Sequence, residues 1–451
     1  MSDYAKQLGA KLLLKGSAGY EAARCAAVWR ANKPGRYPAA IVLAENAEDV
    51  VAGVRWARQQ GLRVSAKSGG HLWTSPWLRD NAVLIDCSRL QQIEVNREAR
   101  TAWAGPGTIG QDLCKQLRPH GLMATTGHHS TVAIGGFLMC GGFGWNSRAW
   151  GNGCANVLAV DVVTAEGELI RADATQNQDY YWAVRGSGPG FFGVVTRFLL
   201  RVHPLPPVFR HTAHSYPLEA LEDLLGWAME AGKSVAPKVE FILSAASQDG
   251  LGRWAPTRIT ASALAICDSD EEAFQGLAFM DTCPAIGKAN RRRNALLTTL
   301  EERYESGTMA DPIGYRYACD NLWTNAPAAQ ILPLTRELFG TMPTPRTHVF
   351  WQQWNPVLPL VDMAHSVQAD LYIGAYTIWE DPAEDEAMMR WPVEQMRRFE
   401  HLGCGGQLND ENINARPQRY MSEEASARLE RLRAQHDPHG VFVSFMQPGM
   451  S

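Results

Sequence analysis

Short apolar runs alternate with amphipathic stretches over the first two hundred residues. The run 39–43 is apolar throughout, and the segment 48–61 has an apolar stripe at helical spacing, acidic residues in its first turn and a glycine at its end. The run 62–65 then completes a predicted strand, helix and strand. The same reasoning predicts strands at 83–86, 101–104, 157–163, 165–170 and 194–202, with a helix at 109–117.

The pattern changes after residues 203–207, where three prolines interrupt it. Alternating apolar and polar positions then predict four strands, and helical periodicity predicts the segments between them. This arrangement is typical of an α+β fold with a largely antiparallel sheet. The predicted strands are 239–244, 259–266, 348–354 and 371–379, and the predicted helices are 218–231, 271–281, 331–339, 382–399 and 423–435.

Composition narrows the class of protein. The chain has 451 residues, which is enough for two or three domains, and 45% of them are apolar and 20% charged. The net charge of −4, with scattered lysines and arginines, argues against a nucleic-acid partner. We expect no membrane partner, because no apolar run is long enough to span a bilayer. Nine cysteines without a C-x-x-C pair predict no metal site and favour the cytoplasm.

Two glycine-rich blocks are the strongest chemical signals. Ser68-Gly69-Gly70-His71 follows a predicted strand, and successive N–H groups in such a turn can bind an anion next to a nucleophilic imidazole. Taken alone, this segment is better explained by an ordinary surface turn. The second block spans 127–144, and its six glycines suit backbone that folds closely around a ligand. A third glycine pattern, at 188–193, leads into a strand instead of a helix, so we do not assign it to NAD.

The blocks resemble the motifs of one flavoprotein family. Residues 67–71 resemble the R-S-G-G-H motif of proteins with the vanillyl-alcohol-oxidase, or PCMH-type, FAD-binding fold. Residues 130–144 and 179–188 are similar to the C-P-T-V-G-V-G-G…G-G-G-x-G and D-L-F-W-A-L-R-G-G-G motifs of its berberine-bridge-enzyme-like oxidases. That group includes 6-hydroxynicotine oxidases and oligosaccharide oxidases.

The resemblance implies a domain organisation. Residues 1–205 would form an α+β, two-subdomain FAD-binding domain of the PCMH type. Residues 206–408 would form the substrate-binding domain, whose largely antiparallel sheet is covered by helices. Residues 409–451 would return to the FAD-binding domain.

The resemblance also implies where FAD binds. In this family the motif histidine is bonded to the flavin, so His71 would carry FAD. Some members add a second bond from the cysteine of C-P-T-V, but His129 occupies that position here, so we expect a single attachment. The expected FAD-binding residues are Lys67, Ser68, Gly69, Gly70, His71, Leu72, Thr131, Val132, Gly135, Gly136, Gly141, Gly142, Gly144, Val194 and Asn409.

The catalytic base is harder to assign. The family's Y-x-N-Y motif appears as Gln-Leu-Asn-Asp at 407–410, so Asp410 stands where a tyrosine often acts as base. Tyr372 matches a second family base position, and strand alternation places Tyr376 on the same face. A phenol with a pKa near ~10 needs a nearby lysine or arginine to act as a base at neutral pH. The catalytic candidates are therefore Tyr372, Asp410 and Tyr376.

Substrate contacts are predicted more loosely. The two faces of strand 348–354 carry different aromatic side chains, and either face could line a pocket. A half-buried strand with a solvated polar edge explains the pattern about as well. The residues that we assign to the substrate are His129, Trp351, Gln353 and Glu240.

The family resemblance implies an FAD-dependent oxidase. It would take a hydride from a C–H bond next to O or N of a small aromatic, heterocyclic or sugar-like substrate and pass the electrons to O2, giving hydrogen peroxide. Two alternatives remain open: a tailoring enzyme that performs oxidative cyclisation of a natural product, and a flavin-binding protein with weak or no oxidase activity. A monomer and a homodimer are equally compatible with the sequence.

Overall fold

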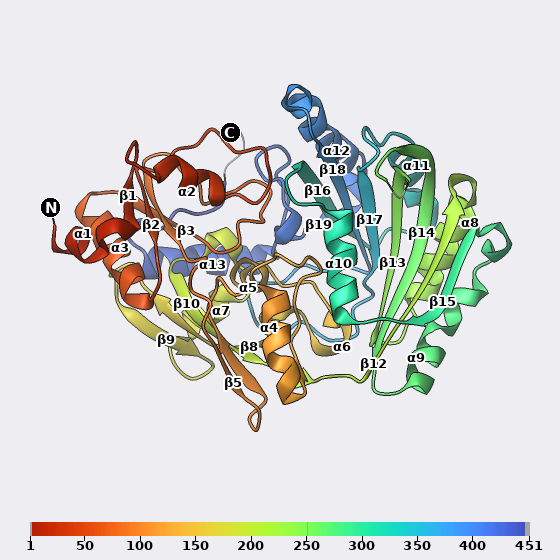
Figure 1. Cartoon of the computed structure of the whole chain (residues 1–451), viewed down its shortest axis with the longest axis horizontal. Helices are drawn as coiled ribbons and strands as arrows, with labels where there is room; N and C mark the ends of the chain where they lie inside the picture. The colour runs from red at the N-terminus through yellow and green to blue at the C-terminus, as the bar shows by residue number, and fades with distance from the viewer. Residues whose placement is uncertain (1, 250, 447–451) are drawn as a thin grey trace.

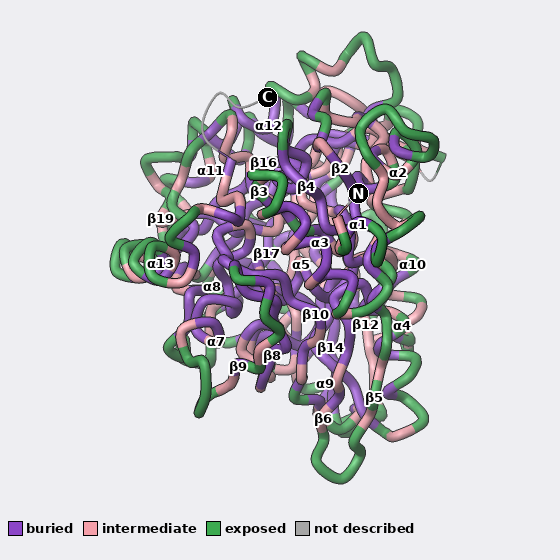
Figure 2. The backbone as a smooth tube through the Cα atoms, turned by 90° about the vertical axis from the view of Figure 1, so that its left-hand side faces the viewer, coloured by how far each residue is buried: buried purple, intermediate pink, exposed green. Residues whose placement is uncertain are grey.

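The computed structural model describes residues 2–249 and 251–446. Two smaller sheets built from the first half of the chain lie beside one large sheet built from the second half (Figure 1). The sheets form the buried interior, with exposed helices and loops around them (Figure 2). This mixed architecture confirms the α+β prediction.

The first sheet has the strand order β1-β2-β4-β3. β2 and β3 both run parallel to β4, and β1 runs antiparallel to β2. The connecting helix α3 begins at Asn46, whose side chain accepts a hydrogen bond from the backbone N–H of Asp49. The predicted strand, helix and strand are thereby confirmed. The bounds are β1 Leu12–Leu14, β2 Ala40–Leu43, α3 Ala47–Gln59, β3 Arg63–Lys67 and β4 Ala82–Asp86.

The second sheet is antiparallel throughout, with the order β5-β6-β10-β8-β9. The glycine pattern at 188–193 forms a short 3-10 turn that leads into β10, as the sequence predicts. The bounds are β5 Ile93–Asn96, β6 Thr101–Ala104, α4 Gly110–Leu117, α5 Ile134–Met139, β8 Val157–Val163, β9 Leu169–Asp173, α7 Gln178–Val184 and β10 Val194–Arg201.

The third sheet has eight antiparallel strands in the order β15-β12-β14-β13-β17-β18-β16-β19. The four strands predicted from sequence form its centre, but four others were missed. β16 was missed because it buries polar residues, Asp320 and Asn321, that do not follow an apolar pattern. The bounds are β12 Val208–Pro217, β13 Val239–Gln248, β14 Trp254–Cys267, β15 Arg291–Leu297, β16 Arg316–Thr324, β17 His348–Gln353, β18 Leu371–Trp379 and β19 Gly403–Gly405.

Helices cover one face of this large sheet. Their apolar side chains pack on a single core with the inward side chains of β13, β14 and β17. The opposite face of β17 and β18 is turned toward the two smaller sheets, and the site lies there. The helices are α8 Leu221–Gly232, α9 Asp270–Leu277, α11 Ala328–Gly340 and α12 Asp385–Phe399, and the separate helix α10 spans Leu300–Ala310.

The end of the chain returns to the first half of the molecule. Helix α13, Glu423–His436, packs into the core of the second sheet (Figure 1). Backbone hydrogen bonds then join Val64 of β3 to Val441 at 2.7 Å and to Val443 at 2.9 Å. In the part of the chain that the structure describes, every helix is too short or too polar to cross a lipid bilayer.

Candidate functional site

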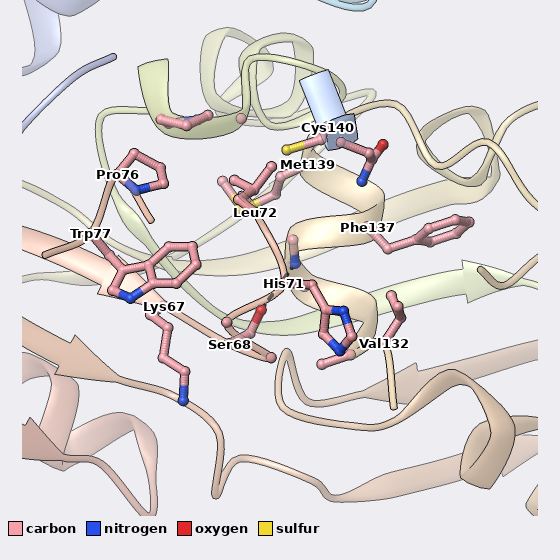
Figure 3. Close-up of a pocket in the computed structure, with 18 of the residues that line it drawn as sticks. Lys67, Ser68, His71, Leu72, Pro76, Trp77, Val132, Phe137, Met139 and Cys140 are labelled. Atoms are coloured by element: carbon pink, nitrogen blue, oxygen red, sulfur yellow. Dashed lines mark hydrogen bonds between the residues drawn. The ribbon is translucent and has the colours of Figure 1, made fainter. Parts of the chain in front are cut away.

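A cavity of about 330 Å³ lies between the smaller sheets and the face of β17 and β18 that is turned away from the covering helices. Five segments that are far apart in the sequence line it: 64–73, 127–143, 188–195, 348–376 and 407–410. Figure 3 shows the part that is built from the two glycine-rich blocks, including His71, Leu72 and Val132. The sequence motifs therefore meet around one hollow space.

The first glycine block offers free backbone donors to this cavity. Among described residues, the N–H groups of Gly69 through Leu72 find no hydrogen-bond acceptor. Gly70 has φ +77, and a Cβ there would lie 2.5 Å from the carbonyl oxygen of Ala27, so only glycine fits. Consecutive unpaired N–H groups suit an anion or a ring carbonyl, and FAD carries both. This part of the cavity fits FAD.

The second block packs directly against the first. The backbone N–H of Gly136, in α5, donates to Ser68 Oγ at 3.0 Å. A Cβ on Gly135 would lie 2.8 Å from both Ser68 Oγ and Pro106 Cβ. Gly135, Gly136, Val132 and the more distant Val194 all line the cavity, as expected of FAD contacts.

Three glycines of the second block do not line the cavity, and close contacts within the protein account for them, so their assignment to FAD stays a prediction. A Cβ on Gly144 would lie 2.1 Å from the carbonyl oxygen of Thr126, and one on Gly142 would lie 2.7 Å from Gly153 Cα. Gly141 packs in the same way against His365. These positions need glycine because protein segments approach one another closely there.

Lys67 is largely engaged elsewhere. Its ammonium group lies 3.0 Å from both carboxylate oxygens of Asp86, in a buried ion pair. Figure 3 shows its side chain extending away from His71. Lys67 therefore ties β3 to β4 and lines the cavity chiefly with its stem.

His71 is fixed in a defined orientation. Its Nε2 lies 3.1 Å from the carbonyl oxygen of Thr131 and 3.0 Å from Thr131 Oγ1. Its ring stacks on Trp29 at 4.7 Å. Burial, with a smaller contribution from His129, lowers the pKa of His71 to about 3, so the imidazole is neutral and nucleophilic at physiological pH.

The three catalytic candidates meet on the opposite wall. Tyr372 donates to Asp410 Oδ2 at 2.7 Å, and its hydroxyl lies 3.2 Å from that of Tyr376. Trp73, two residues after His71, donates from Nε1 to Asp410 Oδ1 at 3.0 Å. Both tyrosines come from β18, as strand alternation predicted, and all four side chains line the cavity.

The electrostatics distinguish the aspartate from the tyrosines. Burial first, and then Asp410, raise the pKa values of Tyr372 and Tyr376 well above the usual phenol range. Neither phenol has the lysine or arginine neighbour that activation would require, as far as the described residues show. Burial also raises the pKa of Asp410, although hydrogen bonds from Trp73 and the two phenols oppose this. The tyrosines are hydrogen-bond donors here, and Asp410 is the acceptor.

Asn409 also lines the cavity. Gln407 positions it, because Gln407 Nε2 donates to Asn409 Oδ1 at 2.8 Å and to the carbonyl oxygen of Cys140 at 3.0 Å. The next residue, Glu411, is buried behind the wall, where it contacts Thr74 Oγ1 and the backbone N–H of Ile413. Burial raises the pKa of Glu411 to about 7.

Two of the predicted substrate contacts are wrong. Trp351 and Gln353 lie on the face of β17 that is turned to the helices, and Trp351 is fully buried in the core beneath them. The other face of β17 supplies His348 and Phe350 to the cavity. The sequence could not distinguish the faces, because both are covered and both carry aromatic residues.

Of the other two predicted substrate contacts, His129 lines the cavity and Glu240 does not. Glu240 does not line the cavity; it lies behind His128, to whose Nε2 it is bonded at 2.8 Å. His129 does line it, but both of its ring nitrogens are already bonded within the protein. Other lining residues were missed by the sequence prediction, among them Trp29, Trp73, Phe143 and Asp311. His348 and Phe350 belong to the face of strand 348–354 that the sequence left open as a pocket wall, and His128 lines the cavity beside His129.

Within residues 2–249 and 251–446, no three histidine, cysteine, aspartate or glutamate side chains are grouped so that they could hold a metal ion. The cavity wall instead combines backbone donors, aromatic rings and one buried carboxylate. That donor set suits an organic cofactor better than a metal ion.

Comparisons with known proteins agree with this reading. Residues 38–173 match the FAD binding domain family. The chain is 31% identical to FAD-linked oxidoreductase nodO of Hypoxylon pulicicidum over 93% of both chains. It is 34% identical to (R)-6-hydroxynicotine oxidase of Paenarthrobacter nicotinovorans, over 38% of this chain and 37% of the relative. The solved structure of BBE-like 1 from Physcomitrella patens superimposes with a TM-score of 0.84 at 19% identity, covering 99% of this chain and 98% of the other.

These findings confirm the PCMH-type fold and the resemblance to berberine-bridge-enzyme-like proteins. The long match to nodO covers both halves of the molecule, so it extends beyond the FAD-binding part. The protein belongs to the FAD-linked oxidoreductases.

Proposed function

We propose that the protein is an FAD-dependent oxidase that takes a hydride from a C–H bond next to O or N of a small substrate and uses O2 as electron acceptor, giving hydrogen peroxide. The observation that carries this proposal is the buried carboxylate of Asp410, held by Trp73 and Tyr372 in the wall of the cavity that fits FAD. The flavin supplies the hydride acceptor, and the protein supplies the base and the positioning.

In this proposal Asp410 removes the proton from the substrate hydroxyl or amine. Each of its oxygens accepts one hydrogen bond from the protein, which fixes the carboxylate plane. A carboxylate whose pKa is raised by burial is a stronger base than a solvated one. Tyr372 then acts as a donor that orients Asp410, and Tyr376 extends the network by one hydroxyl.

FAD would be held by the free N–H groups of Gly69 through Leu72 and bonded once, through His71. A single attachment is favoured because both nitrogens of His129 are engaged. Cys140 lines the cavity, but burial raises the pKa of its thiol, so it is not a ready nucleophile. We assign residues 1–205 and 409–451 to the cofactor and 206–408 to the substrate.

The substrate would be aromatic or heterocyclic, with at least one hydrogen-bond donor. Phe143, Phe350 and His348 contribute ring surfaces to the cavity. Among the residues that the structure describes, Asp311 Oδ1 is buried and finds no hydrogen-bond partner. It lies 3.7 Å from His348 Nε2, and a substrate amine or hydroxyl could donate to it. The relative named (R)-6-hydroxynicotine oxidase supports a heterocyclic substrate; a sugar-like one is the alternative.

The test has two measurements on the purified protein. Anaerobic mixing with a library of alcohols, amines and hydroxylated heterocycles should bleach the flavin absorbance with at least one compound, and aerobic turnover should give one hydrogen peroxide per product. Asp410→Asn is the control, because it keeps the shape of the site and removes the base.

Product analysis separates the alternatives. A cyclised product would favour the tailoring enzyme. Flavin that no compound in the library reduces would favour the flavin-binding protein and contradict the oxidase.

A further inference from the structure

A continuous chain of hydrogen bonds joins His71 to His129 through Thr131. His71 Nε2 contacts the carbonyl oxygen and Oγ1 of Thr131, at 3.1 and 3.0 Å. His129 Nδ1 lies 3.0 Å from the same Oγ1 and accepts the backbone N–H of Thr131 at 3.2 Å. At the far end, His129 Nε2 lies 2.9 Å from the carbonyl oxygen of Asp311.

The direction of each bond follows from the partners. A carbonyl oxygen can only accept, so His71 and His129 both carry their proton on Nε2. A backbone N–H can only donate, so His129 Nδ1 is unprotonated. The Thr131 hydroxyl therefore donates to His129 Nδ1 and accepts from His71 Nε2–H.

This arrangement leaves the lone pair of His71 on Nδ1. Among the residues described, nothing forms a hydrogen bond with that nitrogen. Trp29 holds both rings, since it stacks on His71 at 4.7 Å and meets His129 edge-on at 5.2 Å. His71 is thus a neutral nucleophile with a fixed tautomer and a fixed ring plane.

We propose that His129, acting through Thr131, is a positioning residue and proton acceptor that makes His71 Nδ1 the atom to which FAD becomes attached. This inference rests on the covalent link in the proposed function. Some members of the family have a cysteine at the position of His129, and that cysteine forms the second bond to FAD. In this protein the residue at that position instead supports the bond from His71.

Attachment would form one bond to the flavin and break one bond within it. A bond forms between His71 Nδ1 and the 8α carbon of the flavin, and one C–H bond of that methyl group breaks. The C–H electron pair reduces the flavin, and the methyl proton leaves. His71 loses its Nε2 proton to Thr131 Oγ1 as the threonine hydroxyl passes its own proton to His129 Nδ1. Molecular oxygen reoxidises the flavin, and the two hydrogens end in hydrogen peroxide.

The test follows acid-stable flavin over time after FAD is added to protein purified from riboflavin-limited cells. Thr131→Val removes the hydroxyl and keeps the carbonyl, and Thr131→Ser is its matched control. His129→Phe keeps a planar ring against Trp29 and removes the proton acceptor. We expect attachment to be slower by about a hundredfold in Thr131→Val and His129→Phe, which is the low end of general base catalysis, and unchanged in Thr131→Ser. Thr131 itself does not line the cavity, so total bound FAD, measured by absorbance, should be the same in Thr131→Val and Thr131→Ser.

Chemical rescue adds an independent readout. In His129→Ala, added imidazole should restore part of the attachment rate, which a purely structural role would not allow. Attachment at the wild-type rate in both Thr131→Val and His129→Phe would overturn the inference. Wild-type flavin that is released entirely by acid would overturn it together with the covalent link, whereas the oxidase proposal would still be judged by flavin reduction. If His129→Phe fails to bind FAD, the comparison of Thr131→Val with Thr131→Ser decides whether the inference holds.

Discussion

The two walls of the cavity are built in different ways. The cofactor wall is formed mainly by backbone atoms. The N–H groups from Gly69 to Leu72 are free to bind a ligand, and Gly135 lies where a larger side chain would collide with its neighbours. On the substrate wall, side chains from separate segments converge, with Tyr372 from β18 and Asp410 from beyond β19. A backbone-built wall needs particular residues in fixed order, whereas a side-chain wall needs only the right groups to meet in space.

Because the two walls are built differently, mutations in them should affect different properties of the protein. A change on the cofactor wall disturbs the fold of the segment itself, so it should alter FAD content and stability together. A change on the substrate wall should alter the rate and leave FAD in place. The following four predictions test this contrast.

The largest effect is expected at Asp410. Asp410→Asn should slow anaerobic flavin reduction by about 10²–10⁴-fold with unchanged FAD content, because it removes the base and keeps the shape. Tyr372→Phe should have a smaller effect, since it removes only a donor to that carboxylate. Stopped-flow absorbance measures both. If Tyr372→Phe slowed flavin reduction more than Asp410→Asn, Tyr372 and not Asp410 would be the base.

The second prediction concerns the pH dependence of stability and Glu411. This residue follows Asp410 and contacts Thr74, which comes shortly after the first glycine block. Burial raises its pKa from 4.5, the value for an ordinary glutamate, to about 7. Between these two pH values the folded protein therefore keeps a proton that the unfolded chain loses. Stability should therefore fall as the pH rises from about 4.5 to 7, by up to about 3 kcal/mol. Urea unfolding of Glu411→Gln over this range should show a flatter profile than the wild type. An identical decline in both proteins would show that another group is responsible.

Gly70→Ala should damage the cofactor wall. The residue has φ +77, which costs an alanine roughly 1–2 kcal/mol, and its Cβ would meet the Ala27 carbonyl oxygen at 2.5 Å. We expect a lower melting temperature and less bound FAD. Gly61→Ala is the matched control, because φ is +65 there and nothing lies within 4 Å. Equal losses in the two variants would mean that backbone strain alone, and not the close approach, matters.

The smallest effect compares neighbours on β17. Phe350→Leu should raise KM several-fold and leave the melting temperature nearly unchanged, because Phe350 lines the cavity. Trp351→Phe should do the opposite and cost about 1–3 kcal/mol of stability, because Trp351 is buried under the helices. Thermal melts and steady-state kinetics separate the two outcomes. A KM change in Trp351→Phe alone would place the substrate elsewhere.

The cofactor wall was largely predictable from sequence. Ser68 to His71 and Gly135-Gly136 are contiguous, and contiguous residues fold next to one another. The sequence could not separate Gly141, Gly142 and Gly144 from the glycines that line the cavity, because a glycine needed for protein packing looks the same in sequence as one needed for a ligand. Only the neighbouring atoms, such as the Thr126 carbonyl beside Gly144, distinguish them.

The substrate wall was predictable only in part. Alternation along β18 correctly paired Tyr372 with Tyr376, because both lie on one strand. The link from Trp73 to Asp410 spans more than three hundred residues, and no local pattern encodes it. The same holds for β16, whose buried Asp320 is compensated by Arg416 from the end of the chain.

The return of the chain end to β3 has a consequence for how the protein matures. Val441 and Val443 bond to Val64, four residues before Ser68, and Asp410 belongs to the same late segment. Synthesis proceeds from the N-terminus, so the first sheets can fold while these partners are still unmade. The cavity becomes complete only once residues 441–443 have emerged from the ribosome and paired with Val64. Capture of FAD in its final setting therefore has to wait until this late segment has been made.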